Sequence, residues 1–184
     1  DLYLENRDIF NLQDVMWSLW IAETQPLGIN LVPYAAALET LANAWLSSNK
    51  TKSKGVFVPE PDFSNFMGPK ISSLVASLPP EPEGWRKVAN KLKSINQFGS
   101  NQRISTFFDE IGMPIGEVEE TIMWARNKFA HGGTTSESHN QWLLNVCRGY
   151  RTLVHRALLK VMDYSGEYID YSTYGYPTRP INDP

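Results

Sequence analysis

Apolar residues recur at intervals of three and four along most of this chain, which is the spacing that places them on one face of an α-helix. A second helical signal comes from residues 31–48, which are rich in Ala and Leu, two good helix formers. The pattern predicts a mostly helical protein, with helices at residues 12–25, 31–48, 63–78, 85–98, 102–111, 114–131 and 136–163. The clearest apolar stripe, in the last of these, consists of Leu143, Val146, Cys147, Tyr150, Leu153, Val154, Ala157 and Leu158.

Polar and turn-forming residues divide these helices. Residues 1–10 are expected to form a short extended lead-in, and Asn11 to cap the first helix. Gly68 and Pro69 lie inside the helical pattern of residues 63–78 and are expected to break it. Beyond residue 164 the chain is rich in tyrosine and interrupted by Pro and Gly, which predicts a short strand or hairpin. The expected fold class is therefore all-α with a short C-terminal extended or hairpin tail.

Composition limits the classes of function. The 184 residues are 42% hydrophobic and 20% charged, as in a globular domain. A net charge of -3 argues against broad binding of duplex nucleic acid, which requires a large basic surface, but leaves room for a local phosphate site. Cys147 is the only cysteine, which excludes an internal disulfide and a cysteine-based zinc site and fits a reducing, cytoplasmic location. No apolar run reaches the length needed to cross a bilayer, so we expect no membrane association.

The segment from Trp124 to Gly133 carries the candidate chemistry. Arg126 supplies a permanent forked charge that matches a phosphate group, and His131 can transfer protons near neutral pH. Gly132 and Gly133 are expected to end the helix in a left-handed cap. The negative end of the helix dipole then favours the protonated form of His131. Arginine and histidine together are the minimum set for cutting RNA without a metal ion.

The positions of these residues around the helix suggest a dimer. At about 100° per residue, Asn127 and His131 point to the same side, whereas Arg126 and His131 diverge by about 140°. A site shared between two protomers would bring Arg126 and His131 to one phosphate. A second copy of the helix is also the simplest cover for its second apolar side. The expected core face is Val118, Ile122, Ala125 and Phe129, and the expected second side holds Met123, Trp124 and Ala130 with Asn127 and His131.

The motif Arg126-Asn127-Lys128-Phe129-Ala130-His131-Gly132 resembles the signature of the HEPN superfamily, which has an arginine, a polar residue, a short spacer and a histidine near a helix end. Further resemblance to the Apea-like branch lies in Leu92–Phe98 with Phe107-Phe108, and in the stretch from Leu158 to Tyr171. The resemblance covers residues 31–171. It divides the chain into a lead-in with the first helix at 1–30, a HEPN-like domain at 31–171 and a tail at 172–184.

This resemblance implies an up-and-down helical bundle that forms a homodimer through the motif helix. Many members are metal-independent endoribonucleases of toxin-antitoxin or antiviral defence systems, and they need no cofactor. Carried over, Arg126 stabilises the scissile phosphate, His131 transfers protons as the 2′-hydroxyl attacks, and Asn127 orients His131 or the phosphate. Glu39 is expected to pair with Arg126. In the Apea-like branch the domain is often the C-terminal part of a larger protein, so an upstream domain is expected, as is an antitoxin partner.

Other residues have weaker claims to a role. Lys128 is a candidate contact to the RNA backbone, although a solvated lysine is the default, and Trp124 is a candidate for stacking on a base, although packing at a dimer interface suits Trp124 better. His139 and His155 lack the spacing of metal ligands and are expected to be structural or exposed, so no metal site is expected. Two alternatives to a ribonuclease remain. One is a non-catalytic dimerisation and RNA- or nucleotide-binding module, and the other is a helical scaffold in which Arg126 only forms an ion pair.

Overall fold

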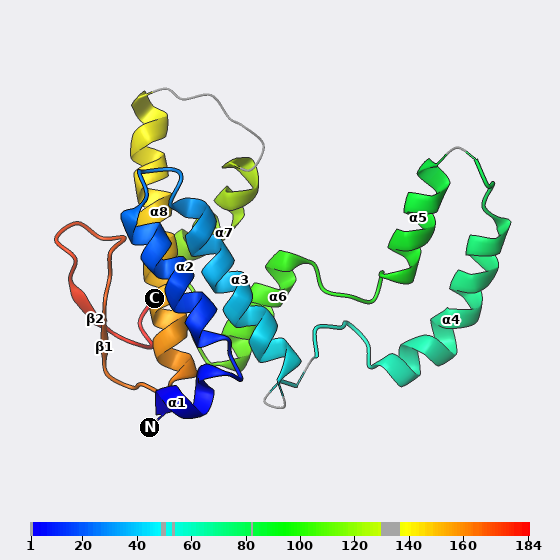
Figure 1. Ribbon diagram of the computed structural model, residues 1–184, viewed down its shortest axis with the longest axis horizontal. Coiled ribbons are helices and arrows are strands. Elements are labelled where there is room, and N and C mark those ends of the chain that lie inside the picture. The colour runs from blue at the N-terminus through cyan, green and yellow to red at the C-terminus, as the bar shows by residue number, and fades with distance from the viewer. Residues whose placement is uncertain (1, 49–50, 53, 82, 130–136) are drawn as a thin grey trace. The chain divides into compact units, whose positions relative to one another are not determined.

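The computed structural model describes residues 2–48, 51–52, 54–81, 83–129 and 137–184, with the backbone alone at 126–129 and 137–139. The described chain divides into two compact units, residues 1–52 with 100–184, called unit 1, and residues 53–99, called unit 2. The helices of unit 1 are α1 (Leu2–Arg7), α2 (Leu12–Thr24), α3 (Leu31–Ser47), α6 (Ser100–Glu110), α7 (Glu117–Phe129) and α8 (Glu137–Val161) (Figure 1). The helices of unit 2 are α4 (Glu60–Ser77) and α5 (Gly84–Lys93).

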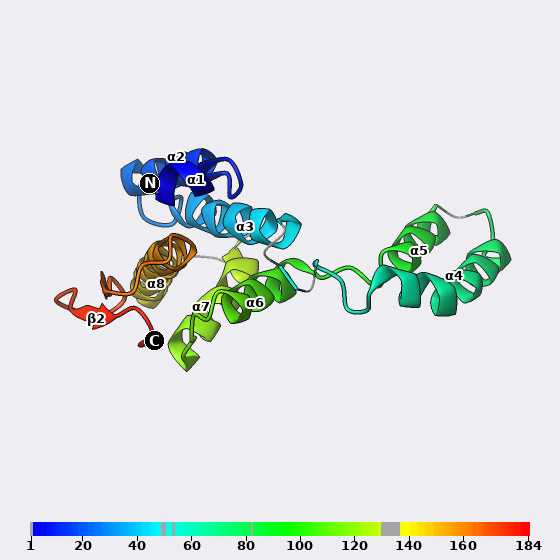
Figure 2. The ribbon, with the colours of Figure 1, turned by 90° about the horizontal axis from the view of Figure 1, so that it is seen from below.

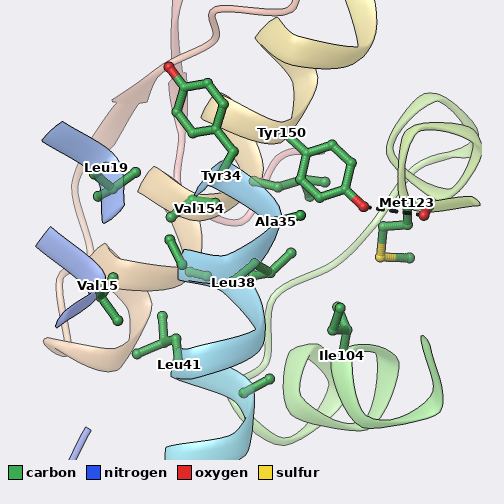
Figure 3. Close-up of a cluster of buried hydrophobic side chains, with 14 of the residues drawn as sticks. Val15, Leu19, Tyr34, Ala35, Leu38, Leu41, Ile104, Met123, Tyr150 and Val154 are labelled. Atoms are coloured by element: carbon green, nitrogen blue, oxygen red, sulfur yellow. Dashed lines mark hydrogen bonds between the residues drawn. The ribbon is translucent and has the colours of Figure 1, made fainter. Parts of the chain in front are cut away.

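Helix α3 is the centre of unit 1. It contacts α2 on one side and α6 and α8 on the other, and α7 packs against α8 (Figure 2). Its alanines let neighbouring helices approach closely on more than one side, while its leucines fill the space between them. The side chains drawn in Figure 3 come from five helices and meet around α3. The buried residues of α3 are Leu31, Tyr34, Ala35, Ala37, Leu38, Leu41, Ala42, Ala44 and Leu46.

A short hairpin follows α8. Strands β1 (Glu167–Ile169) and β2 (Thr178–Pro180) pair antiparallel, with Tyr168 opposite Arg179. Tyr168 is buried, and its ring lies 4.8 Å from the guanidinium carbon of Arg156 on α8. The hairpin is thus attached to the last helix of the bundle. The expected all-α fold with a short C-terminal hairpin is confirmed.

Unit 2 is a helical hairpin closed at its base by extended segments. Val56 forms a β-bridge with Gln97, and the buried side chain of Asn96 forms two hydrogen bonds with the backbone of Val58. The Asn96 amide nitrogen donates to the Val58 carbonyl at 2.8 Å, and its amide oxygen accepts from the Val58 N–H at 3.0 Å. Neither α4 nor α5 contains a fully buried residue. Forty-seven residues with so little buried surface have a small core of their own.

Three expected elements differ from the structure. Residues 2–7 form α1 rather than an extended lead-in, because the Asn6 side chain donates to the Leu2 carbonyl and Phe10 anchors the turn in the core. Helix α4 runs through Pro69 without a break. Helix α5 ends at Lys93 rather than near Phe98, because residues 94–98 pair with residues 55–58.

The compact units are a different kind of division from the predicted domain boundaries at residues 30 and 171, which stay a prediction. Helix α2, placed in the lead-in, packs along α3 in the same core. The segment after residue 171 returns to α8 through β2 and Ile181, which is buried. Instead, residues 53–99 separate from the remainder. Asn11 does precede α2, but it has a left-handed backbone (φ 50°) and no side-chain cap bond.

Candidate functional site

The predicted motif begins in the last turn of α7. The backbone of Arg126, Asn127 and Lys128 is helical, and α7 ends at Phe129. The side chains of these residues, and His131, Gly132 and Gly133 altogether, lie outside the described residues. The expected meeting of Arg126 with His131 therefore stays a prediction, as does the glycine cap.

The part of α7 just before the motif is packed tightly against α8. Ile122, Met123 and Ala125 are buried, and the Tyr150 hydroxyl donates to the Met123 carbonyl at 3.2 Å (Figure 3). Gly149 allows the helices to come this close, since a Cβ on it would lie 2.1 Å from Ile122 Cδ1. The backbone one turn before Arg126 is thus positioned by α8.

The faces of α7 differ in part from the prediction. Ile122 and Ala125 are in the core as expected, but Val118, predicted to be there too, is 65% exposed. Met123, predicted for the second side, is buried instead. It lies only one residue beyond the core position Ile122, and the broad contact with α8 includes it. Trp124 is 63% exposed, so a large apolar side chain does remain on the surface of this helix. Whether it contacts RNA or a second protomer stays a prediction.

The start of α7 is held by an ion pair that the sequence analysis missed. Arg156 on α8 is completely buried and pairs through Nη1 with Glu119 Oε1. Its Nη2 donates to the carbonyls of Pro114 (3.1 Å) and Ile181 (3.2 Å), while Glu119 Oε2 accepts from the Gly116 N–H at 2.8 Å. Arg156 therefore joins α8, the loop before α7 and the C-terminal tail. The sequence signal for this ion pair is that Arg156 lies directly beside Ala157 of the apolar stripe, where a buried charge needs a partner.

A second polar cluster surrounds Asp170, which follows β1. Its carboxylate accepts hydrogen bonds from the hydroxyls of Ser172 and Thr173 and from the Ser172 N–H at 2.9 Å, and it lies 3.0 Å from Arg179 Nε. Burial alone would raise the pKa of Asp170, but the hydrogen bonds and the Arg179 charge outweigh it and lower the pKa. The cluster lines one side of a cleft of about 480 Å³ that also touches the start of α7. The polar groups of Asp170 are thus used internally, to brace the tail.

Glu39 lies half-buried on α3 and accepts a hydrogen bond from the hydroxyl of Ser100, the first residue of α6. It therefore connects two helices of the core of unit 1. The expected pairing of Glu39 with Arg126 cannot be compared with the structure, since the Arg126 side chain is outside the described part, and it stays a prediction.

The remaining titratable candidates have structural surroundings. His155 packs edge-on to Tyr171 with ring centroids 5.3 Å apart, and burial, helped by the Arg151 charge, lowers its pKa. Burial likewise raises the pKa of the Cys147 thiol. The His139 side chain is outside the described residues. Among the side chains that are described, no three His, Cys, Asp or Glu residues come together in a way that would hold a metal ion.

Comparison of the sequence with protein-family models gave no match, and comparisons with curated proteins and with solved structures gave none either. In the described part of the chain, no helix combines the length and the apolar character that crossing a membrane requires. The candidate site therefore rests on the motif and on the helix that carries it.

Proposed function

We propose that this protein is a metal-independent endoribonuclease that works as a dimer through α7. The observation that carries the proposal is the position of the motif: Arg126 and Asn127 lie in the last helical turn of α7, which ends at Phe129, two positions before His131 in the sequence. This is the location that the resemblance to the HEPN signature requires. The packing of Ile122 and Met123 against α8 supports it, because a catalytic group must be carried on a rigid element.

In the proposed reaction, the 2′-hydroxyl of a ribose attacks the adjacent phosphorus and the bond to the 5′-oxygen of the next nucleotide breaks. The products are a 2′,3′-cyclic phosphate and a free 5′-hydroxyl. Arg126 stabilises the charge that develops on the non-bridging oxygens. His131 either accepts the proton that the 2′-hydroxyl loses or donates the proton that the leaving 5′-oxygen gains. Asn127 orients His131 or the phosphate.

The exposed Trp124 supports a dimer through this helix. An isolated tryptophan with most of its surface in water is a common anchor of protein interfaces. A two-fold contact through α7 would cover it and place the Arg126 of each protomer near the His131 of the other. The toxin or antiviral-defence setting is part of the same proposal and comes from the resemblance alone.

The test is RNA cleavage in EDTA by the full chain and by His131→Ala and Arg126→Ala, with Arg103→Ala on α6 as the control. General acid–base catalysis contributes about 10²- to 10⁴-fold, so each motif variant should lose at least 100-fold in rate while the control retains the wild-type rate. Light scattering on wild type and Trp124→Ala reports the dimer. A folded protein that binds RNA but never cuts it would replace the proposal with the non-catalytic binding module.

A further inference from the structure

Helix α5 has a one-sided distribution of positive charge. Its ten residues include Arg86, Lys87, Lys91 and Lys93 and no acidic residue, and all four basic side chains are exposed. Residues 53–99 contain six basic and four acidic residues, whereas the whole chain contains 17 basic and 20 acidic. Unit 2 thus has a net charge of +2 in a chain of net charge -3, and four of its six basic residues lie on α5.

The basic residues lie on the side of α5 that faces away from α4. The half-buried residues of α5 are Ala89 and Leu92, and α5 packs on α4. At about 100° per residue, the four basic residues spread over roughly 160° on the other side of the helix. The charges on this side of α5 are therefore all positive, from Arg86 to Lys93.

The placement of this charge is unfavourable for the helix itself. Arg86 and Lys87 lie in the first turn of α5, where the positive end of the helix dipole repels cations, and that turn contains no acidic residue. The N-cap residue Glu83 compensates this only in part, so helix stability does not fully account for these two residues. Contact with a polyanion would, because it offsets both the dipole and the mutual repulsion of the four charges.

Aromatic side chains accompany this charge within unit 2. Phe66 on α4 is exposed with Lys70 Nζ 3.5 Å from its ring centre. Trp85 is 39% exposed, but it lies about 160° around the helix from the middle of the basic face, on the side of Ala89 and Leu92. Basic side chains that follow a backbone, with rings nearby on which bases stack, are the usual means of binding single-stranded nucleic acid. An interfacial membrane helix needs a free apolar face, and α4 covers that of α5 in part. The proposed ribonuclease function makes RNA the favoured polyanion, with anionic vesicles as the alternative in the test.

We propose that α5 is the RNA-docking element of this protein, with Arg86, Lys87, Lys91 and Lys93 binding the phosphates of single-stranded RNA. This inference rests on the proposed ribonuclease function for its choice of RNA. It explains how a chain of net charge -3 can hold a polyanionic substrate. The docking face lies in a different unit from the motif at the end of α7.

The test measures binding of the full chain to a 20-nucleotide single-stranded RNA with 2′-O-methyl riboses, which cannot be cleaved, by fluorescence anisotropy from 50 to 200 mM salt. The docking variant replaces Arg86, Lys87, Lys91 and Lys93 with Gln, a good helix former. The matched control replaces four basic residues away from α4 and α5, the exposed Arg7, Lys52 and Lys54 and the half-buried Lys160, and changes the net charge equally. Circular dichroism checks that both variants stay helical.

Four phosphate contacts contribute a slope of about 3 to the salt dependence of binding, which is a loss of about 50-fold over this salt range. The docking variant should lose most of this slope and bind at least tenfold more weakly at 50 mM, whereas the control should stay close to wild type. Equal losses in both variants, or unchanged binding by the docking variant, would overturn the proposal. So would docking-dependent sedimentation with phosphatidylserine vesicles but not with phosphatidylcholine vesicles, if RNA binding were unaffected.

The experiments distinguish a failure of the docking inference from a failure of the ribonuclease proposal. If wild type binds the RNA through α5 but cuts no ordinary RNA, the docking inference stands and the catalytic proposal fails. If wild type cuts RNA and the docking variant cuts it with an unchanged KM, the catalytic proposal stands and the docking inference fails.

Discussion

Gly149 on α8 provides a sharp test of how α7 is positioned. In the middle of a helix, Gly→Ala normally stabilises a protein by about 1 kcal/mol. At Gly149, however, the new Cβ would lie 2.1 Å from Ile122 Cδ1, 3.0 Å from Cγ1 and 3.3 Å from Cγ2. Rotation of the end of Ile122 moves Cδ1 away, but Cγ1 and Cγ2 stay close, so this buried side chain must also shift by a few tenths of an ångström. Overpacking of this kind costs about 1–3 kcal/mol, so after the gain of about 1 kcal/mol the net effect of Gly149→Ala should lie between neutral and a destabilisation of about 2 kcal/mol.

The assay is urea unfolding followed by circular dichroism, with hydrogen exchange of α7 and α8 peptides to report unit 1 separately. Gly68→Ala on α4 is the control, because nothing outside its chain neighbours lies within 4 Å of its Cβ position, although the contact with the ring of Pro69 reduces the expected gain in the stability of unit 2. Ile122→Val removes Cδ1 and alone costs about 0.5–1.5 kcal/mol. Combined with Gly149→Ala it should give a protein more stable than Gly149→Ala alone. A Gly149→Ala variant as stabilising as Gly68→Ala, or strictly additive effects of the two changes, would refute the close contact.

Three further perturbations test other parts of the structure. Arg156→Met leaves Glu119 with an unpaired buried charge and should destabilise unit 1 by about 3–5 kcal/mol in urea unfolding. Adding Glu119→Gln should recover part of this loss. An unchanged urea midpoint of Arg156→Met would contradict the pairing. The lowered pKa of Asp170 means that its ionised form stabilises the fold above about pH 4, its unfolded pKa, and that this contribution is lost as the pH falls through the folded pKa. Thermal unfolding of Asp170→Asn should therefore depend less on pH in acid than that of wild type, and parallel profiles would refute this. Trp124→Ala should leave the melting temperature of the chain nearly unchanged but weaken the dimer measured by light scattering, and an unaffected dimer would move the interface away from α7.

Much of the helical arrangement could be predicted because the apolar spacing follows the core. The expected helix at residues 31–48 matches α3 to within one residue, and the expected stripe on α8 is buried except for Leu158, which is half-buried. These are the long helices whose contacts determine both the burial and the sequence pattern. The predicted break at Pro69 was wrong because packing contacts also decide the structure there. Phe63, Met67 and Ile71 continue at helical spacing across the proline and are all half-buried, so packing maintains the helix through it.

The polar interactions could not be predicted because they join residues far apart in sequence. Nothing in the local pattern relates Arg156 to Glu119, 37 positions away, or Asn96 to Val58. The predicted burial of Val118 and exposure of Met123 on α7 were wrong, because a regular helical wheel gives the width of an apolar face only roughly. The motif itself could be located on a helix end from the sequence, whereas the partners of its side chains depend on tertiary contacts.

The division into two units suggests a division of labour that kinetics can separate. If α7 carries the reacting groups, its alignment depends on the Gly149–Ile122 contact, and a displacement of even 1 Å at a catalytic group can cost about 100-fold in rate. If α5 captures the RNA, loss of its charges weakens binding but leaves the bound substrate correctly placed. Gly149→Ala should therefore lower kcat with little change in KM, at a temperature where it is fully folded, whereas the α5 docking variant should raise KM with little change in kcat. If Gly149→Ala raised KM and the α5 docking variant lowered kcat, catalysis would belong to unit 2. If each variant changed kcat and KM equally, the two units would act together on the substrate.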